Sequence, residues 1–278
     1  MVSMGPIKTI SLLANPAVPE CGAAARELEV TLSRQGLDVR AGDRSSASAD
    51  VDLIVVLGGD GYLMESIHAL GFPSTNMFGV NFGTVGFLMN PPGCLAALGE
   101  IIRRRQFRGE VYPVLESTIC LRSGEKHVEL AFNDLVLERA SGQTIRFSTY
   151  VDGTLFNHFS GDGLVIATPG GSTAYTLAAG GPAVHPDVAA VVMTPLYPHR
   201  ATPFHSQQFS LVLPLSRSIR IAGENVDKRP IRALADGRRF EEVASVEVRD
   251  SGQRINLLRV EDHSFVEAVS RTFIGDSE

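Results

Sequence analysis

The chain has 278 residues, which is enough for one large domain or two ordinary ones with a substantial buried core. The composition is that of a globular protein, and the formal net charge is −6. This negative charge argues against nucleic acid or an anionic membrane as the main partner. Three widely spaced cysteines, Cys21, Cys94 and Cys120, suggest neither a disulfide framework nor a zinc site. No apolar run approaches the roughly 18 residues of a membrane helix, so we expect a cytoplasmic protein.

The first third of the chain alternates strand and helix signals. Short apolar strands are expected at 10–14, 52–57 and 77–80. Between them lie two amphipathic helices, the first of which we expect to end at Gly36, and a third helix is indicated at 95–107. This alternation predicts an α/β domain with a parallel sheet, placed at residues 1–108.

From about residue 110 onward the signals are mostly strands. Runs rich in β-branched and aromatic residues fall at 111–121, 127–138, 145–151, 154–160, 163–168, 209–215 and 218–223. Asp152-Gly153, between the runs 145–151 and 154–160, is a strong two-residue hairpin signal, and Asp236-Gly237 offers another between the strand-like runs 230–235 and 245–250. They predict a β-rich, β-sandwich-like domain at 109–257. The tail reads as a strand and a helix, and we expect residues 258–278 to return to and complete the first domain.

An aspartate stands inside a glycine turn at the end of the second predicted strand. The run is Gly58-Gly59-Asp60-Gly61, with no following lysine as in a P-loop and no G-x-G-x-x-G spacing. Glycines at the carboxyl end of a parallel strand allow a ligand to approach the backbone. Because a carboxylate repels phosphate, Asp60 is expected to accept a proton or a hydroxyl hydrogen bond. The alternative is that Asp60 only caps a helix beginning near Tyr62.

Two further polar turns follow strands. Asn81 and Gly83 belong to a glycine turn after the third strand, which is either an ordinary turn or part of the same crevice. Asn133-Asp134 combines an amide and a carboxylate, a pair that can hold both hydroxyls of a ribose. The alternative for this pair is a plain Asx turn at the start of a strand.

The richest stretch is GDGLVIATPGGSTAYTLAAGGPAV, residues 161–184. Its PGGST run ends a strand, and Ser172 and Thr173 are expected to cap a helix over 174–179. A glycine turn, two hydroxyls and a helix N-terminus can bind a phosphate, and Tyr175 can stack on a flat ring. The alternative is a capped helix in a core.

The order of these motifs resembles the NAD kinase family. The match spans about residues 50–200 and consists of GGDG, the NFGTVGFL turn, the Asn-Asp pair, GDG, TPGGSTAYTLAAGGP and the PLYPH loop at 195–199. The TPGGSTAY run is the most specific part. GGDG alone also resembles turns of phosphofructokinases and of diacylglycerol or sphingosine kinases.

The resemblance implies transfer of the ATP γ-phosphoryl group to the 2′-hydroxyl of the adenosine ribose of NAD. It also implies Mg²⁺ or another divalent cation, held mainly by the ATP phosphates, and a homodimer or homotetramer that binds no nucleic acid or membrane. Asp60 is the implied general base, and no protein metal ligands are expected. The implied NAD-binding residues are Gly61, Asn133, Asp134, Asp162, Thr173, Ala174, Tyr175 and Ala178, and the implied phosphate-binding residues are Gly58, Gly59, Asn81, Gly83, Gly170, Gly171 and Ser172.

The sequence departs from the common family pattern at several positions. Tyr62 stands where a threonine usually follows GGDG, Gly170 where a threonine or serine is usual, and Ala178 where a serine is frequent. These departures concern donor contacts and the nucleotide pocket, so the choice between ATP and polyphosphate and between NAD and NADH stays open. A lipid kinase with the same GGDG turn, or a non-catalytic NAD(P)-binding sensor, remains the alternative.

Overall fold

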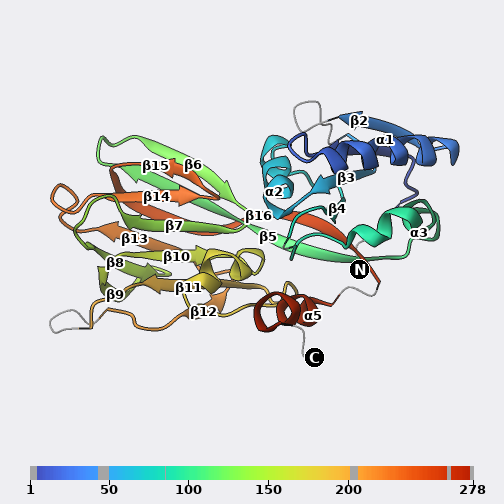
Figure 1. The fold of residues 1–278 in the computed structure, drawn as a ribbon. Coiled ribbons are helices and arrows are strands. Elements are labelled where there is room, and N and C mark those ends of the chain that lie inside the picture. The colour runs from blue at the N-terminus through green and yellow to red at the C-terminus, as the bar shows by residue number, and fades with distance from the viewer. Residues whose placement is uncertain (1–4, 43–49, 85, 201–205, 262–263, 276–278) are drawn as a thin grey trace. The chain divides into compact units, whose positions relative to one another are not determined.

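The computed structural model describes residues 5–42, 50–84, 86–200, 206–261 and 264–275. The chain divides into two compact units, which we call unit 1 (Met1–Val111 and Arg254–Glu278) and unit 2 (Tyr112–Gln253). The chain leaves unit 1 within strand β5 (Phe107–Leu121) and returns to it within strand β16 (Val243–Val260) (Figure 1). The expected return of the tail to the first domain is therefore confirmed.

Unit 1 is built on a parallel sheet, as the sequence predicts. The strand order is β2-β1-β3-β4, with β1 at Thr9–Ala14, β2 at Asp38–Gly42, β3 at Leu53–Gly58 and β4 at Met77–Asn81. The end of β16 adds a further parallel neighbour, since Leu257 pairs with Met77. Every residue of β3 is buried, which explains its unbroken apolar run. The edge strand β2 was not predicted, because its DVRAG sequence is polar and partly exposed.

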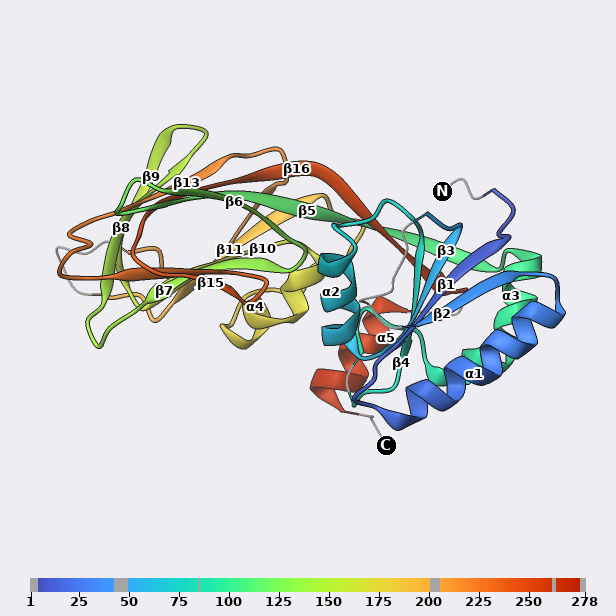
Figure 2. The same ribbon diagram turned by 90° about the horizontal axis from the view of Figure 1, so that it is seen from above.

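Helices cover this sheet. They are α1 (Pro19–Arg34), α2 (Asp60–Ala69), α3 (Leu98–Arg104) after a 3₁₀ turn at Pro92–Ala97, and α5 (Phe265–Val269), which continues as a π-helical turn at Ser270–Ile274. A proline begins α1, and Cys21, Ala25, Leu28 and Leu32 form its buried stripe. Gly36 follows with a φ of 87°, the left-handed conformation that ends helices. α1 and α3 share one core on the same face of the sheet (Figure 2).

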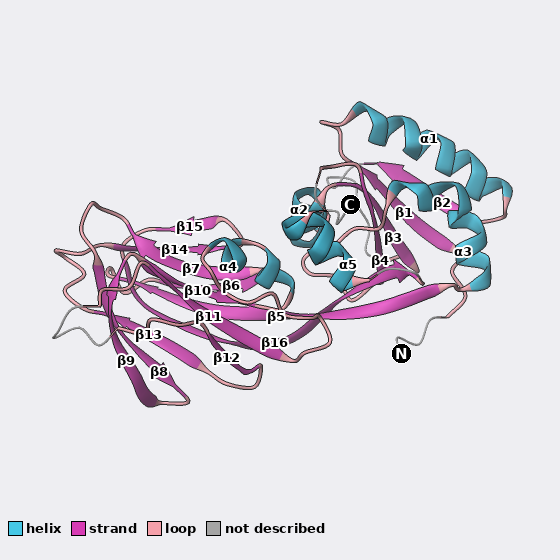
Figure 3. Ribbon diagram, turned by 60° about the horizontal axis from the view of Figure 1, so that its bottom comes forward, coloured by secondary structure: helices cyan, strands magenta, loops and turns pink. Residues whose placement is uncertain are grey.

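Unit 2 is a β-sandwich, as predicted (Figure 3). One antiparallel sheet has six strands in the order β12-β11-β10-β7-β14-β15. In the other, β16-β13-β8-β9 are neighbours, while β5 pairs with β16 and β6. The bounds are β6 Lys126–Ala131, β7 Asp134–Arg139, β8 Ile145–Val151, β9 Thr154–Gly161, β10 Gly163–Ala167, β11 Ala190–Leu196, β12 Leu211–Pro214, β13 Ile219–Gly223, β14 Ile231–Ala235 and β15 Arg238–Phe240, with the short helix α4 at Tyr175–Ala178.

Both predicted hairpin turns are confirmed, although the second joins a different partner strand from the one expected. Asp152 and Gly153 have φ angles of 48° and 77°, and they join β8 to β9. Asp236 and Gly237, at 46° and 85°, join β14 to β15. Positive φ at both central residues is the type I′ geometry, whose twist suits a two-residue hairpin. The partner of β14 in the second hairpin is the short β15, rather than the 245–250 run that the sequence suggested.

The strand predictions fail at two places in unit 2. The run 127–138 is two strands, β6 and β7, interrupted at Phe132-Asn133. β11 was not predicted, because Pro195 made its end look like a loop, yet Pro195 pairs with Leu164 of β10. Within the described part of the chain, no helix is long and apolar enough to cross a membrane.

Candidate active site

Asp60 is the first residue of α2, directly after β3. Its carboxylate accepts the backbone N–H of Phe87 at 2.9 Å and of Leu88 at 3.2 Å. The N-cap of α2 is Gly59, and no side chain caps the helix. The helix-cap alternative for Asp60 is therefore wrong. The carboxylate instead joins the turn after β3 to the loop that follows β4.

Opposing influences act on the acidity of Asp60. Burial raises its pKa, while the two amide hydrogen bonds and the positive charge of Arg259 act in the opposite direction. The net effect is a pKa above the usual value for aspartate. A raised pKa makes a carboxylate a better proton acceptor, and the two amides fix its orientation.

Glycine occupies the positions around Asp60 for different physical reasons. A Cβ at Gly58 would lie 2.9 Å from the ring of Tyr62, so packing inside unit 1 requires this glycine. A Cβ at Gly59 would meet only the Cα of Gly83, at 3.9 Å, and one at Gly61 would meet nothing within 4 Å. The backbone at Gly59 and Gly61 is therefore open to a ligand. The Tyr62 ring packs against Gly58, and its hydroxyl donates to the carbonyl of Ala14 at 2.9 Å.

The loop after β4 is an Asx turn. The amide of Gly83 donates to Asn81 Oδ1 at 2.9 Å, and Asn81 Nδ2 donates to the Gly83 carbonyl at 3.2 Å. Asn81 and Thr84 line a cleft of about 590 Å³ at this end of β4, together with Arg271 from the C-terminal helical segment. Glu267 lines the same cleft, so the cleft has both a positive and a negative side chain in its wall.

The predicted Asn133-Asp134 pair lies at the break between β6 and β7. The carboxylate of Asp236 accepts three successive amides there, from Phe132 at 2.6 Å, Asn133 at 2.9 Å and Asp134 at 3.1 Å. The amide of Asp236 in turn donates to the carbonyl of Asp134 at 3.0 Å. The β14–β15 hairpin therefore fixes the shape of this turn. The sequence indicated Asp236 only as a hairpin residue, and no local signal pointed to the three amides that its carboxylate accepts.

Asp134 has a strongly perturbed carboxyl group. Its side chain is buried, and burial, with the nearby negative charge of Asp236, raises its pKa to about 7. Near neutral pH this carboxyl can therefore be a hydroxyl donor or an ionised acceptor. A ribose hydroxyl is a suitable partner for either form.

The PGGST run differs from its prediction. Ser172 and Thr173 do not cap a helix over 174–179, because α4 has only the four residues Tyr175–Ala178 and no side-chain cap. Ser172 is fully buried, and its hydroxyl donates to the Pro169 carbonyl at 2.6 Å and accepts from the Val184 amide at 2.9 Å. A four-residue helix supplies little dipole for a phosphate.

Packing also accounts for the glycines of this run. A Cβ at Gly171 would lie 2.1 Å from the carbonyl oxygen of Asn133, so only glycine fits there. Gly170 is buried as well, and its Cβ would lie 3.0 Å from the ring of Tyr112. The hydroxyl of Thr168 donates to the Phe132 carbonyl at 2.7 Å. The run is thus built against the Asn133-Asp134 turn. Packing by itself accounts for its two glycines, and the phosphate contacts of Gly170, Gly171 and Ser172 stay predictions.

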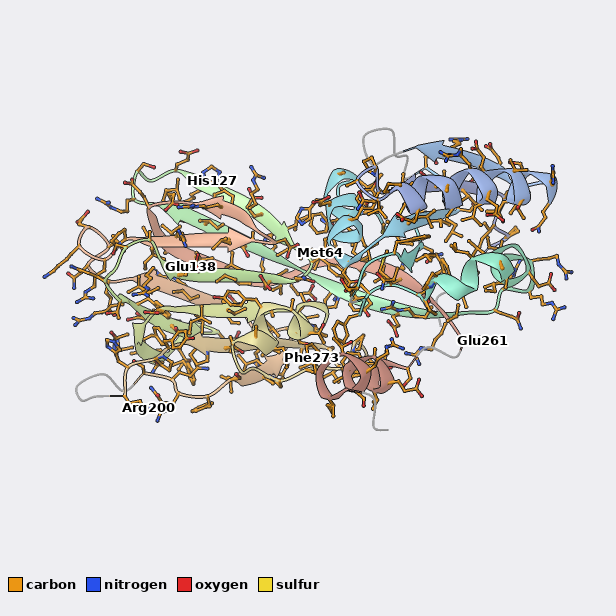
Figure 4. The ribbon with its side chains drawn as sticks, in the orientation of Figure 1. Met64, His127, Glu138, Arg200, Glu261 and Phe273 are labelled. Carbon is orange, nitrogen blue, oxygen red and sulfur yellow. The ribbon has the colours of Figure 1, made fainter. Side chains whose placement is uncertain are left out.

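The exposed part of the same stretch faces open space. Tyr175 and Ala178 line a cleft of about 730 Å³ in unit 2. Arg200, labelled in Figure 4, and Phe209 also line it, and no motif in the sequence indicated either residue. The carboxylate of Asp162 lies 3.3 Å from the guanidinium of Arg139. Across the described ranges, no group of three or more His, Cys, Asp or Glu side chains could hold a metal ion.

The aspartate that amides hold after a parallel strand of unit 1, and the buried carboxyl of unit 2 whose pKa is raised, each fit an enzyme that acts on a nucleotide. Comparison with known proteins defines the class further. A family model described as the ATP-NAD kinase N-terminal domain matches residues 10–110, and one described as the ATP-NAD kinase C-terminal domain matches residues 132–260.

Individual relatives agree over most of the chain. An NAD kinase of Zymomonas mobilis is 33% identical over 266 residues, which are 94% of this chain and 96% of that protein. An NAD kinase of Xanthomonas oryzae is 31% identical, covering 94% and 95% of the two chains. The chain therefore belongs to the NAD kinase family, and it is an ATP-dependent kinase that acts on an alcohol group.

Solved structures show the same fold. A yeast NADH kinase complexed with NADH superposes with a TM-score of 0.81 at 22% identity, over 99% of this chain and 89% of that one. An Archaeoglobus fulgidus NAD kinase in complex with ATP gives a TM-score of 0.74 at 22% identity, over 96% and 97%. The α/β and β-rich architecture expected from the sequence is that of this family.

Proposed function

We propose that this protein transfers the γ-phosphoryl group of ATP to the 2′-hydroxyl of the adenosine ribose of NAD and so makes NADP. The observation that carries the proposal is Asp60, held by two backbone amides in an open glycine turn. It lies in a chain that resembles NAD kinases over 94% of its length. Matches to both domains of that family leave the lipid-kinase alternative without support.

Asp60 is the proposed general base. The ribose oxygen forms a bond to the γ-phosphorus while its proton passes to the Asp60 carboxylate. The bond from the γ-phosphorus to its bridging oxygen breaks, and ADP leaves with the electron pair. Phosphoryl transfer depends mainly on positioning and charge stabilisation, so one oriented base is sufficient protein chemistry. The raised pKa of Asp60 suits this role.

Asn133 and Asp134 are proposed to bind the ribose of NAD. The side-chain amide of Asn133 can donate and accept, and the carboxyl of Asp134 lies at the point where Asp236 fixes the turn. Tyr175 and Ala178 are proposed to contact a ring of NAD, which their place on the 730 Å³ cleft supports. Four further proposed NAD contacts are Gly61, Asp162, Thr173 and Ala174.

The donor phosphates are proposed to bind at the turns after β3 and β4. The open backbone at Gly59 and the Asx turn of Asn81 and Gly83 support this placement, and Arg271 adds a positive charge to the adjoining cleft. Mg²⁺ or another divalent cation enters as part of the ATP substrate, held mainly by its phosphates. The residues that the structure describes offer no metal cluster of their own, so we assign no step to a protein-held metal.

The test is direct. Purified protein is incubated with NAD, ATP and Mg²⁺, and NADP is measured with an NADP-specific dehydrogenase. NADP formed in proportion to enzyme is the expected result. Binding of NAD without NADP formation would instead indicate a sensor, and phosphorylation of diacylglycerol vesicles would indicate a lipid kinase. Parallel reactions with NADH and with polyphosphate settle the acceptor and donor preferences.

We also propose that the protein is a cytoplasmic homodimer or homotetramer. The resemblance to the family supports the assembly, and the edge strands of unit 2, β9, β12 and β15, are edges that an assembly can cover. Three free cysteines suit a reducing compartment. Light scattering that finds a stable monomer at working enzyme concentrations would remove the oligomer proposal.

A further inference from the structure

Arg259 is a buried arginine that contacts the loop of the proposed base. It lies near the end of β16, with 1% of its surface exposed. Its Nε donates to Glu110 Oε2 at 2.7 Å, and its Nη2 donates to the backbone carbonyl of Phe87 at 2.8 Å. Glu110, which is also 1% exposed, accepts a second hydrogen bond from Arg108 at 2.7 Å.

Phe87 links Arg259 to Asp60. The carbonyl of Phe87 accepts from Arg259, while its amide donates to the Asp60 carboxylate at 2.9 Å. The ring of Phe87 stacks on Phe273, with ring centroids 5.2 Å apart and an interplanar angle of 14°. Phe273, labelled in Figure 4, belongs to the C-terminal helical segment. One residue of the loop is therefore held at its amide, its carbonyl and its side chain.

We infer that Arg259 is a positioning residue for Asp60, an inference that rests on the proposed general-base role of Asp60. Arg259 fixes the Phe87 carbonyl and thereby the direction in which the Phe87 amide points at the carboxylate. Leu88, the next residue, supplies the second amide to Asp60, so a shift of the loop displaces both donors together. Misplacement of a reacting group by about 1 Å can lower a rate by roughly 10²-fold.

Arg259 also has an electrostatic effect on Asp60. Its positive charge opposes the burial that raises the pKa of Asp60. Among the described residues, Arg259 is the charged side chain that acts on Asp60, and Glu110 is the anion paired with it. Removing the charge of Arg259 therefore raises the pKa of Asp60 further. Because a base must be ionised, the acidic limb of the kcat profile then moves to higher pH.

Stability alone does not explain a buried Glu110–Arg259 pair. Well-packed apolar residues often replace a buried ion pair without loss, whereas removal of one partner leaves an uncompensated charge and destabilises the fold. An apolar replacement cannot donate to the Phe87 carbonyl. The double variant Glu110→Leu/Arg259→Met therefore separates the structural contribution of the pair from its effect on Asp60.

The experiment compares this double variant with Arg108→Met, a control that removes the other arginine bound to Glu110 and leaves Phe87 untouched. We expect the double variant to fold and to bind NAD within a few-fold of the parent. Its kcat at pH 7 should fall roughly 10²-fold, with the acidic limb shifted to higher pH. Arg108→Met should keep the parent profile. A folded double variant with the kcat and pH profile of the parent overturns the inference.

Two further variants keep the result decisive. If the double variant does not fold, Arg259→Lys is measured. It retains the positive charge but cannot donate to Glu110 and to the Phe87 carbonyl at once, and it should lower kcat about tenfold with little shift of the acidic limb. An unchanged kcat in Arg259→Lys then overturns the inference. Asp60→Asn is measured in parallel. If Asp60→Asn keeps its turnover, the proposed general base itself is wrong, whereas lost turnover there with an unaffected Arg259 series refutes only the role of Arg259.

Discussion

Asp60 and Asp134 are both aspartates at the first residue of an element, α2 and β7, and the charges of the side chains near them differ in sign. Asp60 accepts two backbone amides and lies under the influence of the Arg259 cation. Asp134 faces the Asp236 anion, and its own amide is among the three that Asp236 accepts. Burial raises the pKa of both carboxyls, but only at Asp60 do the neighbours oppose it.

This difference separates two tasks that a kinase acting on a ribose needs. A base must be ionised, oriented and still able to take a proton, which the amides and the cation provide for Asp60. A carboxyl that only holds hydroxyls can titrate near neutrality, because its protonated form still makes hydrogen bonds. The chemistry of each carboxyl is therefore set less by its own position in the chain than by which amides and charges reach it.

The largest expected effect is a difference in kcat between variants of the two aspartates. Asp60→Ala should lower kcat by roughly 10²–10⁴-fold, the usual contribution of a positioned base. Asp134→Ala should leave kcat within about threefold, because ribose binding is regained at saturating NAD. Initial rates of NADP formation at saturating substrates provide the measurement. Equal losses of kcat in the two variants would contradict the proposal that the two aspartates have different roles.

The next effect concerns substrate affinity. Asp134→Ala should raise the KM for NAD about 10–100-fold, the loss expected for a hydrogen bond to a charged group, while the KM for ATP stays nearly constant. Asp134→Asn is the matched control, since it keeps the size and most of the hydrogen bonding. A folded Asp134→Ala variant with the parent KM for NAD contradicts the ribose assignment.

Substitutions at two glycines distinguish a glycine needed for packing from one needed for ligand contact. Gly171→Ala places a Cβ 2.1 Å from the Asn133 carbonyl, so it should lower the free energy of unfolding by about 1–3 kcal/mol. The added methyl of Gly61→Ala meets nothing within 4 Å, so this variant should keep its stability nearly unchanged while its KM for NAD rises. Urea denaturation and KM values on both variants check this. Gly61→Ala with unaltered kinetics would remove Gly61 from the ligand site.

The smallest predicted effect is a pH dependence. The pKa of Asp134 is raised to about 7, so its carboxyl is mostly protonated below that pH and ionised above it. An ionised acceptor binds a hydroxyl more strongly, and the KM for NAD should therefore fall roughly fivefold as pH rises through this range. Asp134→Asn should lack this change. A parent KM that is flat in pH, or that rises with it, contradicts the predicted state of Asp134.

The sequence predicts those features that depend on neighbouring residues. The unbroken apolar run of β3 and the two Asp-Gly hairpins required no distant information, and the family motifs located Asp60 and Asn133-Asp134. The contacts that set their chemistry are long-range. Asp236 reaches Asp134 from 102 residues away, and Arg259 reaches Phe87 from 172 residues away.

The wrong helix cap has the same cause. Ser172 looks like a helix cap in sequence, but its hydroxyl is used inside the fold by Val184. Gly171 stays a predicted phosphate contact, although the close approach of Asn133 already requires a glycine there. A glycine or a serine in a turn is compatible with a ligand or with another part of the chain. Only the contacts in three dimensions distinguish the two.

The central claim is that Asp60 is the base of an NAD kinase, and the isosteric variant Asp60→Asn tests it most directly. NAD affinity is measured by calorimetry and turnover by NADP formation on the same preparation. The account predicts NAD binding within a few-fold of the parent and a kcat lower by roughly 10²–10⁴-fold, because only the proton acceptor is lost. Turnover within about threefold of the parent, well below that contribution, would contradict it.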